Sequence, residues 1–116
     1  MARLTAALLL GGALFTLPVL AEEVQVQVLQ EKLNHPWSVA FLPDNQTLLI
    51  TERSGQLRSW RSESGLSQPI EGVPKAVVRR QAGLLDVVLA PDFAQSRRVW
   101  LSFTEANSSG ELGAAG

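Results

Sequence analysis

The sequence predicts an all-β fold built from a repeated unit of short strands, and three observations support this. Apolar Val24, Val26 and Val28 alternate with polar residues, which is the period-two pattern of a half-buried strand. Short apolar runs are separated by turn residues such as Pro43-Asp44-Asn45. The same order of runs and turns then recurs 48 to 53 residues later. A strand repeat of this length is typical of a β-propeller or another all-β array.

The first repeat predicts a meander of antiparallel strands. Residues 22–30 are expected to form the first strand, and a second apolar run begins at Trp37 and stops at Pro43-Asp44. Residues 48–52 and 56–60 form two more strands, and Arg53-Ser54-Gly55 supplies the turn between them. Short turns of this kind join neighbouring strands of one sheet.

A second unit begins before residue 87. When Pro91-Asp92 is aligned with Pro43-Asp44, residues 87–90 fall over residues 39–42, and residues 101–105 fall over residues 48–52. The turn at residues 93–98 then has five extra residues. The Gly-, Ala- and Ser-rich residues 107–116 are expected to form a loop tip rather than a closing strand. Because a blade needs neighbours on both faces, residues 22–116 are expected to be the N-terminal fragment of a β-propeller domain, of low stability alone.

Residues 1–21 have the layout of a secretory signal peptide. Arg3 precedes an uncharged, largely apolar run, and Val19 and Ala21 occupy the minus-three and minus-one positions of a cleavage after Ala21. A membrane anchor is the alternative, since a run of this length can just span a bilayer, but its glycines and proline disfavour a stable helix. We expect an exported protein with no stable membrane anchor after cleavage.

Composition excludes several function classes. With 10 Lys and Arg against 11 Asp and Glu, the chain has no electrostatic reason to bind nucleic acid. It has no cysteine and one histidine, His35, so zinc ligation by His and Cys and Cys-His catalysis are excluded within this chain. No glycine-rich phosphate-binding loop occurs.

We predict structural rather than catalytic roles for three other polar residues. His35 stands near Trp37, which we expect to be a buried aromatic anchor, and its imidazole is expected to donate to a backbone carbonyl as a fastener. Asp44 and Asp92 follow proline at matching repeat positions, where an Asp side chain commonly accepts backbone N–H groups. We therefore predict no catalytic residue among these three.

Gln81 is the candidate site residue. It stands at the mouth of a predicted strand, two residues before Gly83, which can let backbone approach a neighbour closely. Its amide both donates and accepts, so it can orient a hydroxyl-rich substrate or a quinone, although a turn role is equally compatible with the sequence. The arginine pairs at residues 79–80 and 97–98 either line an anionic ligand or lie solvated at the rim.

The two stretches LNHPWSVAFLPDNQTLLITERSGQLRSW and QAGLLDVVLAPDFAQSRRVWLSFTE together resemble the N-terminal region of the soluble, pyrroloquinoline-quinone-dependent aldose sugar dehydrogenases. These enzymes form the glucose/sorbosone dehydrogenase family. The resemblance runs from about Val24 to Glu105. It implies a six-bladed β-propeller in the periplasm, of which this chain holds the first blade and the start of another.

The resemblance also implies an activity. The family oxidises aldose sugars at the anomeric carbon by hydride transfer to pyrroloquinoline quinone, with calcium beside the quinone, a histidine as general base and an external electron acceptor. Gln81 matches the glutamine of the family's Q-x-G-L-L motif and is the one residue carried over, as a cofactor or substrate contact. Ala82 stands where close relatives often have glycine. The catalytic histidine, the quinone-contacting cations and the calcium ligands belong to later blades, so we expect the 116-residue chain alone to be inactive. The alternative is a secreted, non-catalytic propeller that binds carbohydrate or a protein partner.

Overall fold

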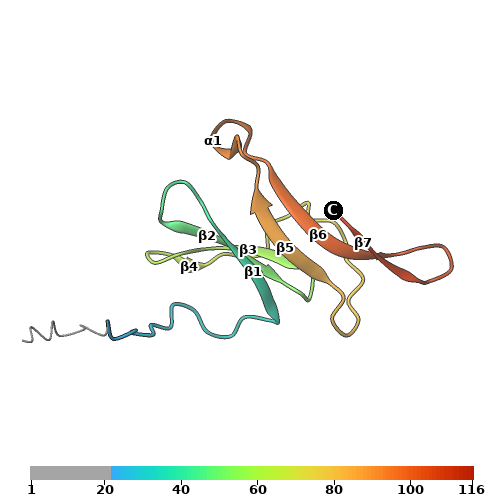
Figure 1. Ribbon diagram of the computed structural model, residues 1–116, viewed down its shortest axis with the longest axis horizontal. Coiled ribbons are helices and arrows are strands. Elements are labelled where there is room, and N and C mark those ends of the chain that lie inside the picture. The colour runs from blue at the N-terminus through green and yellow to red at the C-terminus, as the bar shows by residue number, and fades with distance from the viewer. Residues whose placement is uncertain (1–21) are drawn as a thin grey trace, which may run out of the picture.

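The computed structural model describes residues 22–116, which fold into two antiparallel sheets (Figure 1). The first sheet contains β1 (Pro36–Phe41), β2 (Thr47–Glu52), β3 (Gln56–Arg61) and β4 (Gly65–Leu66), paired in chain order. The second contains β5 (Leu84–Leu89), β6 (Val99–Ala106) and β7 (Leu112–Ala115), and the short helix α1 (Phe93–Ser96) joins β5 to β6. This confirms the predicted all-β class and the meander order. The predicted signal peptide, residues 1–21, lies outside the described residues.

The structure confirms the repeat and corrects its alignment. β1 and β5 are equivalent: each is the first strand of its meander, and each has an irregular register after its first pair, Pro36 with Glu52 and Leu84 with Phe103. Glu52 is therefore equivalent to Phe103, so the predicted match to residue 105 is wrong by two residues. Phe41 pairs with Leu48 but Leu89 pairs with Val99, so the second connection is longer by three residues rather than five. Those residues allow α1 to form there.

The expected strand at residues 22–30 is wrong. This segment is irregular chain without strand pairing, and the alternating side chains of Val24, Val26 and Val28 are 88%, 88% and 68% exposed. Alternation identifies a segment that can pair, but a strand also needs a neighbour whose N–H and C=O groups face its own. Within residues 22–116 no such neighbour is in place.

The expected loop tip at the end of the chain is also wrong, because the tail returns as β7 beside β6. Asn107 starts the turn: its side-chain oxygen accepts the N–H groups of Ser109 and Glu111, both at 2.9 Å, and Gly110 takes a φ of +79°. This local Asx geometry needs no apolar pattern in the returning strand. The second unit is therefore a three-stranded meander rather than the start of one.

The core lies between the two sheets. Leu49 and Leu57 from the first sheet pack with Leu84 and Val87 from the second, and all four are buried. Each such side chain contributes about 1.5–3 kcal/mol on burial. On the outer face of β1, by contrast, Trp37 is 49% exposed, so its expected burial as an anchor is wrong for the described part of the chain.

Polar contacts join β1 and β2 to β5. The Ser38 hydroxyl donates to the Asp86 carboxylate at 2.5 Å, and these two residues occupy equivalent repeat positions. The hydroxyl of Thr51, which is fully buried, donates to the carbonyl of Leu85. Figure 1 shows β1 and β5 side by side, with α1 at one end of the second sheet and the chain entering β5 at the other. The equivalent strands of the two units are therefore fixed relative to each other.

Candidate functional site

The candidate site is the turn through which the chain enters β5, residues 79–83. Arg79 and Ala82 exchange two backbone hydrogen bonds, of 3.2 and 2.8 Å, and Arg80 adopts a φ of +54°. Arg80 and Gln81 therefore occupy the tip of a tight two-residue turn. Gln81 is exposed, and its amide makes no hydrogen bond to any other residue of 22–116. The predicted place of Gln81 at the mouth of a strand is confirmed, and its amide is available to a ligand.

Arg53, in the turn between β2 and β3, holds this segment from the first sheet. Its guanidinium donates to the carbonyl oxygens of Arg80 and, at 3.4 Å, of Ala82. Its backbone carbonyl accepts the N–H of Leu84 at 3.2 Å, and its own N–H donates to the carbonyl of His35 at 2.7 Å. One residue of the first sheet thus binds both sides of the Gln81 turn and the loop before β1.

Gly83 is required because Arg53 approaches it so closely. A Cβ at position 83 would overlap the carbonyl oxygen of Arg53 and would lie 2.7 Å from its Cγ. The overlapping oxygen is backbone, so a side-chain rotation cannot relieve the clash. The prediction that Gly83 permits a close backbone approach is confirmed, and the partner is the turn of the first sheet.

Thr104 of β6 holds the turn from the other side. Its N–H donates to the carbonyl of Gly83 at 3.0 Å, and its hydroxyl donates to the carbonyl of Val77 at 2.7 Å. The N–H of Val77 donates back to the carbonyl of Thr104 at 2.8 Å. The two ends of the segment that carries Gln81 are therefore fixed to one residue of a central strand.

Glu52 lies directly beside Arg53 and is 1% exposed. Its carboxylate accepts the N–H of Asn34 at 2.5 Å and forms an ion pair with Arg58 at 3.1 Å. A buried carboxylate needs such partners, because removing a charge from water is costly. Sequence reasoning missed both Glu52 and Arg53; charged residues directly after an apolar strand run were the available signal.

His35 does not act as the predicted fastener. Its Nδ1 lies 2.7 Å from the side-chain oxygen of Asn34, so the ring partner is a neighbouring side chain and not a backbone carbonyl. The fastening atom of His35 is instead its own carbonyl oxygen, which accepts the N–H of Arg53. The side chain of His35 is exposed.

The two arginine pairs lie at opposite ends of β5. Arg79 and Arg80 are exposed beside Gln81. At the far end, Arg97 lies over the ring of Phe93 at 5.4 Å, and Arg98 pairs with Asp92 at 3.2 Å. The first pair can meet a ligand of Gln81, whereas the second already has partners within its own turn.

The two Pro-Asp turns also differ. Asp44 accepts the N–H groups of Gln46 and Thr47 at 2.9 and 2.8 Å, as predicted. The hydroxyl of Thr47, followed by these N–H groups, lowers the pKa of Asp44 to about 2. The expectation for Asp92 is wrong, because its carboxylate accepts the Ser96 hydroxyl at 2.8 Å and the Arg98 guanidinium rather than backbone N–H groups. The residues that form α1 after Asp92 account for the difference.

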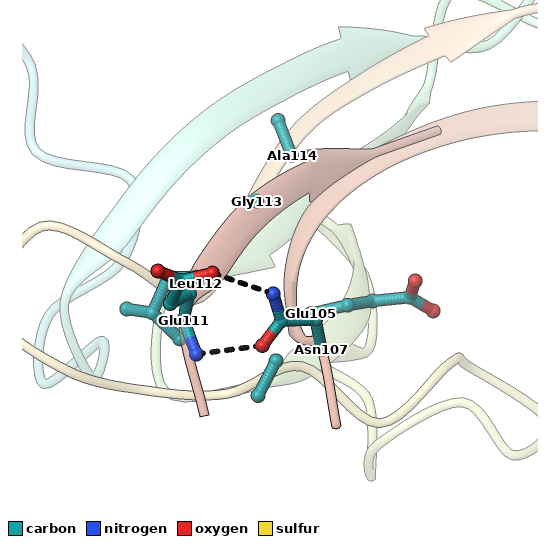
Figure 2. Close-up of a pocket in the computed structure, with 7 residues that line it drawn as sticks. Glu105, Asn107, Glu111, Leu112, Gly113 and Ala114 are labelled. Carbon is teal, nitrogen blue, oxygen red and sulfur yellow. Dashed lines mark hydrogen bonds between the residues drawn. The ribbon is translucent and has the colours of Figure 1, made fainter. Parts of the chain in front are cut away.

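A separate hollow of about 290 Å³ lies along the β6–β7 hairpin (Figure 2). Figure 2 shows the carboxylates of Glu105 and Glu111 pointing to opposite sides. Asn107 binds Glu111 twice, through the side-chain amide at 2.8 Å and the side-chain oxygen at 2.9 Å. The polar atoms in this hollow therefore stabilise the hairpin turn and do not converge on a ligand position.

The described part of the chain contains no group of three or more His, Cys, Asp or Glu side chains placed to hold a metal ion. Over the same residues, no helix has the length and apolar character that crossing a membrane requires. The site is thus an exposed amide that follows two exposed arginines, on a turn held by Arg53 and Thr104. Such a site can contact a hydroxyl-rich or anionic ligand, but it supplies no general base of its own.

Comparison with known proteins gives consistent matches. The family model described as Glucose / Sorbosone dehydrogenase matches residues 33–115. The chain is 56% identical over 106 residues to aldose sugar dehydrogenase YliI of Escherichia coli K12, an alignment that covers 91% of this chain and 28% of that protein. The chain thus spans about a quarter of the length of this relative.

Solved structures agree. The soluble aldose sugar dehydrogenase of Escherichia coli, in its apo form, superposes with a TM-score of 0.74 at 59% identity, covering 76% of this chain and 25% of that one. The PQQ-bound form of aldose sugar dehydrogenase from Streptomyces coelicolor superposes with a TM-score of 0.65 at 27% identity, covering 77% of this chain and 26% of that one.

Proposed function

The chain belongs to the glucose/sorbosone dehydrogenase family, and we propose that the full-length protein is a quinoprotein oxidoreductase that oxidises aldose sugars at the anomeric carbon by hydride transfer to pyrroloquinoline quinone. The observation that carries the proposal is 56% identity, over nearly the whole chain, to an aldose sugar dehydrogenase. A PQQ-bound structure among the similar proteins supports the choice of cofactor. Turnover further requires an external electron acceptor.

In this proposal Gln81 contacts the sugar or the quinone. Its amide is exposed at a turn tip, has no partner among residues 22–116, and can donate to one ligand oxygen while it accepts from a hydroxyl group. Arg79 and Arg80 beside it add positive charge, which suits a cofactor that bears carboxylates. The residues present therefore fit the rim of a quinone site, and bound pyrroloquinoline quinone would supply the hydride acceptor.

Residues 22–116 supply neither a ligand set for the calcium ion of this proposal nor a side chain for its general base. Residues 22–116 hold no cluster of metal-ligating side chains, and the ring of His35 contacts Asn34 at 2.7 Å. We therefore assign both functions to the part of the full-length protein beyond this segment, and we expect the 116-residue chain alone to be inactive. The share of this chain in the reaction is to place Gln81.

The test uses full-length protein loaded with pyrroloquinoline quinone and calcium. Aldose oxidation is followed with an artificial electron acceptor, for the wild type and for Gln81→Ala. Gln95→Ala is the matched control, because Gln95 is exposed on α1 at the other end of β5. We expect sugar-dependent reduction of the acceptor, a loss of kcat/KM of about 10-fold or more in Gln81→Ala, and no change in Gln95→Ala. A wild type that binds sugar but does not oxidise it would favour the non-catalytic alternative.

We further propose that the protein is exported to the periplasm. The support is the sequence layout of residues 1–21, with its charged start and its small residues before the cleavage point. N-terminal sequencing of the protein from a periplasmic extract is expected to begin at Glu22. Retention of Met1 or Ala2 on a cytoplasmic product would contradict this.

A further inference from the structure

We infer that Arg53 is a positioning residue for Gln81: its guanidinium, donated from the first sheet, sets the orientation of the turn tip in the second. The inference rests on the proposed role of Gln81 and identifies what holds that side chain in place. It concerns a contact across the two repeats, between residues 27 to 29 positions apart in the sequence.

The geometry singles out the guanidinium of Arg53. One of its two acceptors is the carbonyl of Arg80, which belongs to the peptide group that leads directly into Gln81. The other is the carbonyl of Ala82, the residue that follows Gln81. Hydrogen bonds on both sides of a residue restrict the rotation of its backbone, and with it the direction in which its side chain leaves the turn. Hydrogen bonds from an ionised donor are also the stronger kind.

Arg53 is itself fixed, so it can transmit a position. Its N–H and carbonyl bind His35 and Leu84 at 2.7 and 3.2 Å. The preceding residue, Glu52, is buried and paired with Arg58. These backbone bonds already join the sheets without the guanidinium. Within residues 22–116 the guanidinium forms no ion pair with a carboxylate, and its hydrogen bonds go to the Gln81 turn alone.

A double-mutant cycle in the full-length, cofactor-loaded protein tests the inference, with sugar oxidation as the readout. Arg53→Ala is expected to lower kcat/KM by about 10- to 100-fold, because small displacements of a contacting group have effects of this size. In a Gln81→Ala background, Arg53→Ala is expected to lower kcat/KM by less than about twofold further, because the side chain that Arg53 positions is already absent. Arg53→Lys, which keeps one charged donor, is expected to recover part of the loss.

Hydrogen exchange gives a second readout that does not depend on activity. Arg53→Ala is expected to speed amide exchange in a peptide covering residues 79–84, and Gln81→Ala is not. Arg61→Ala is the matched control, because Arg61 donates to the side chain of Gln46 at 2.9 Å at the other end of the same strands. It is expected to leave both exchange in residues 79–84 and kcat/KM unchanged.

The outcomes separate the two proposals. Unchanged exchange in Arg53→Ala, or losses of kcat/KM that multiply fully in the double variant, would overturn the positioning role. A silent Gln81→Ala would refute the proposed site role of Gln81. In that case faster exchange at residues 79–84 still supports Arg53 as the group that orders the turn, and unchanged exchange overturns it.

Discussion

Replacing Gly83 with alanine tests how tightly the two sheets are joined. The added methyl would overlap the carbonyl oxygen of Arg53 and lie 3.0 Å from its carbonyl carbon, so backbone must move in one sheet or the other. Overpacking of this kind costs about 1–3 kcal/mol. The movement also breaks the 3.2 Å hydrogen bond from Leu84 to Arg53, and leaving that buried N–H unpaired costs about 1–3 kcal/mol more.

Partial relaxation reduces the sum, so we expect Gly83→Ala to lower the free energy of unfolding of the full-length protein by about 2–4 kcal/mol. Urea denaturation followed by tryptophan fluorescence measures the change. Gly113→Ala is the matched control, because a Cβ at that position in β7 has no atom within 4 Å. The control is expected to stay within about 0.5 kcal/mol of the wild type. If Gly83→Ala is as stable as the control, the close approach of Arg53 to Gly83 is not a constraint on the fold.

Three further predictions concern single side chains. Hydrogen bonds from Thr47 and its neighbour lower the pKa of Asp44 to about 2. The ionised carboxylate therefore stabilises the folded state above the ordinary pKa of 3.8, and this stabilisation is lost as the pH falls toward 2. Acid titration of the unfolding free energy should show a shallower loss of stability over that range for Asp44→Asn than for the wild type. Glu52→Ala is expected to lower the free energy of unfolding, measured by urea denaturation, by about 3 kcal/mol, because it leaves the Asn34 N–H and the Arg58 guanidinium without the carboxylate that they bind, whereas the exposed Glu63→Ala should not. Asn107→Ala removes the acceptor that forms the β6–β7 turn, so amide exchange in residues 112–115 should accelerate while exchange in β2 stays unchanged.

The sequence was sufficient for the elements whose patterns are local. The strands after Trp37, Asn45 and Gly55 are confirmed, because apolar runs and turn residues specify them without reference to distant residues. The repeat is confirmed for the same reason. The predicted alignment of its second strand is wrong by two residues, because the shared Thr-Glu pair does not reflect the strand register that the pairing of Leu84 with Phe103 establishes.

The errors come from interactions that local pattern does not contain. The alternating valines after Glu22 lack a pairing neighbour among residues 22–116, whereas the tail after Asn107, which has few apolar residues, pairs with β6. Hydrophobic periodicity therefore gives the wrong prediction for both segments. At the site, the place of Gln81 followed from Gly83 and the strand after it. The contact between Arg53 and the Gln81 turn could not be predicted, because the two turns belong to different repeats and the sequence alone does not show which turns lie in contact.

The close contact between Arg53 and Gly83 limits how such repeats can be recombined in chimeric proteins. A blade in a repeat protein is often treated as an exchangeable module with its own contents. Here the space that a Cβ of residue 83 would need is occupied by Arg53 of the preceding unit, so a glycine at position 83 and the turn that carries Arg53 have to be inherited together. A chimera whose crossover falls between β4 and β5 would separate them. One whose crossover falls before Thr47 or after Leu89 would keep the pair, and with it the position of the Gln81 turn.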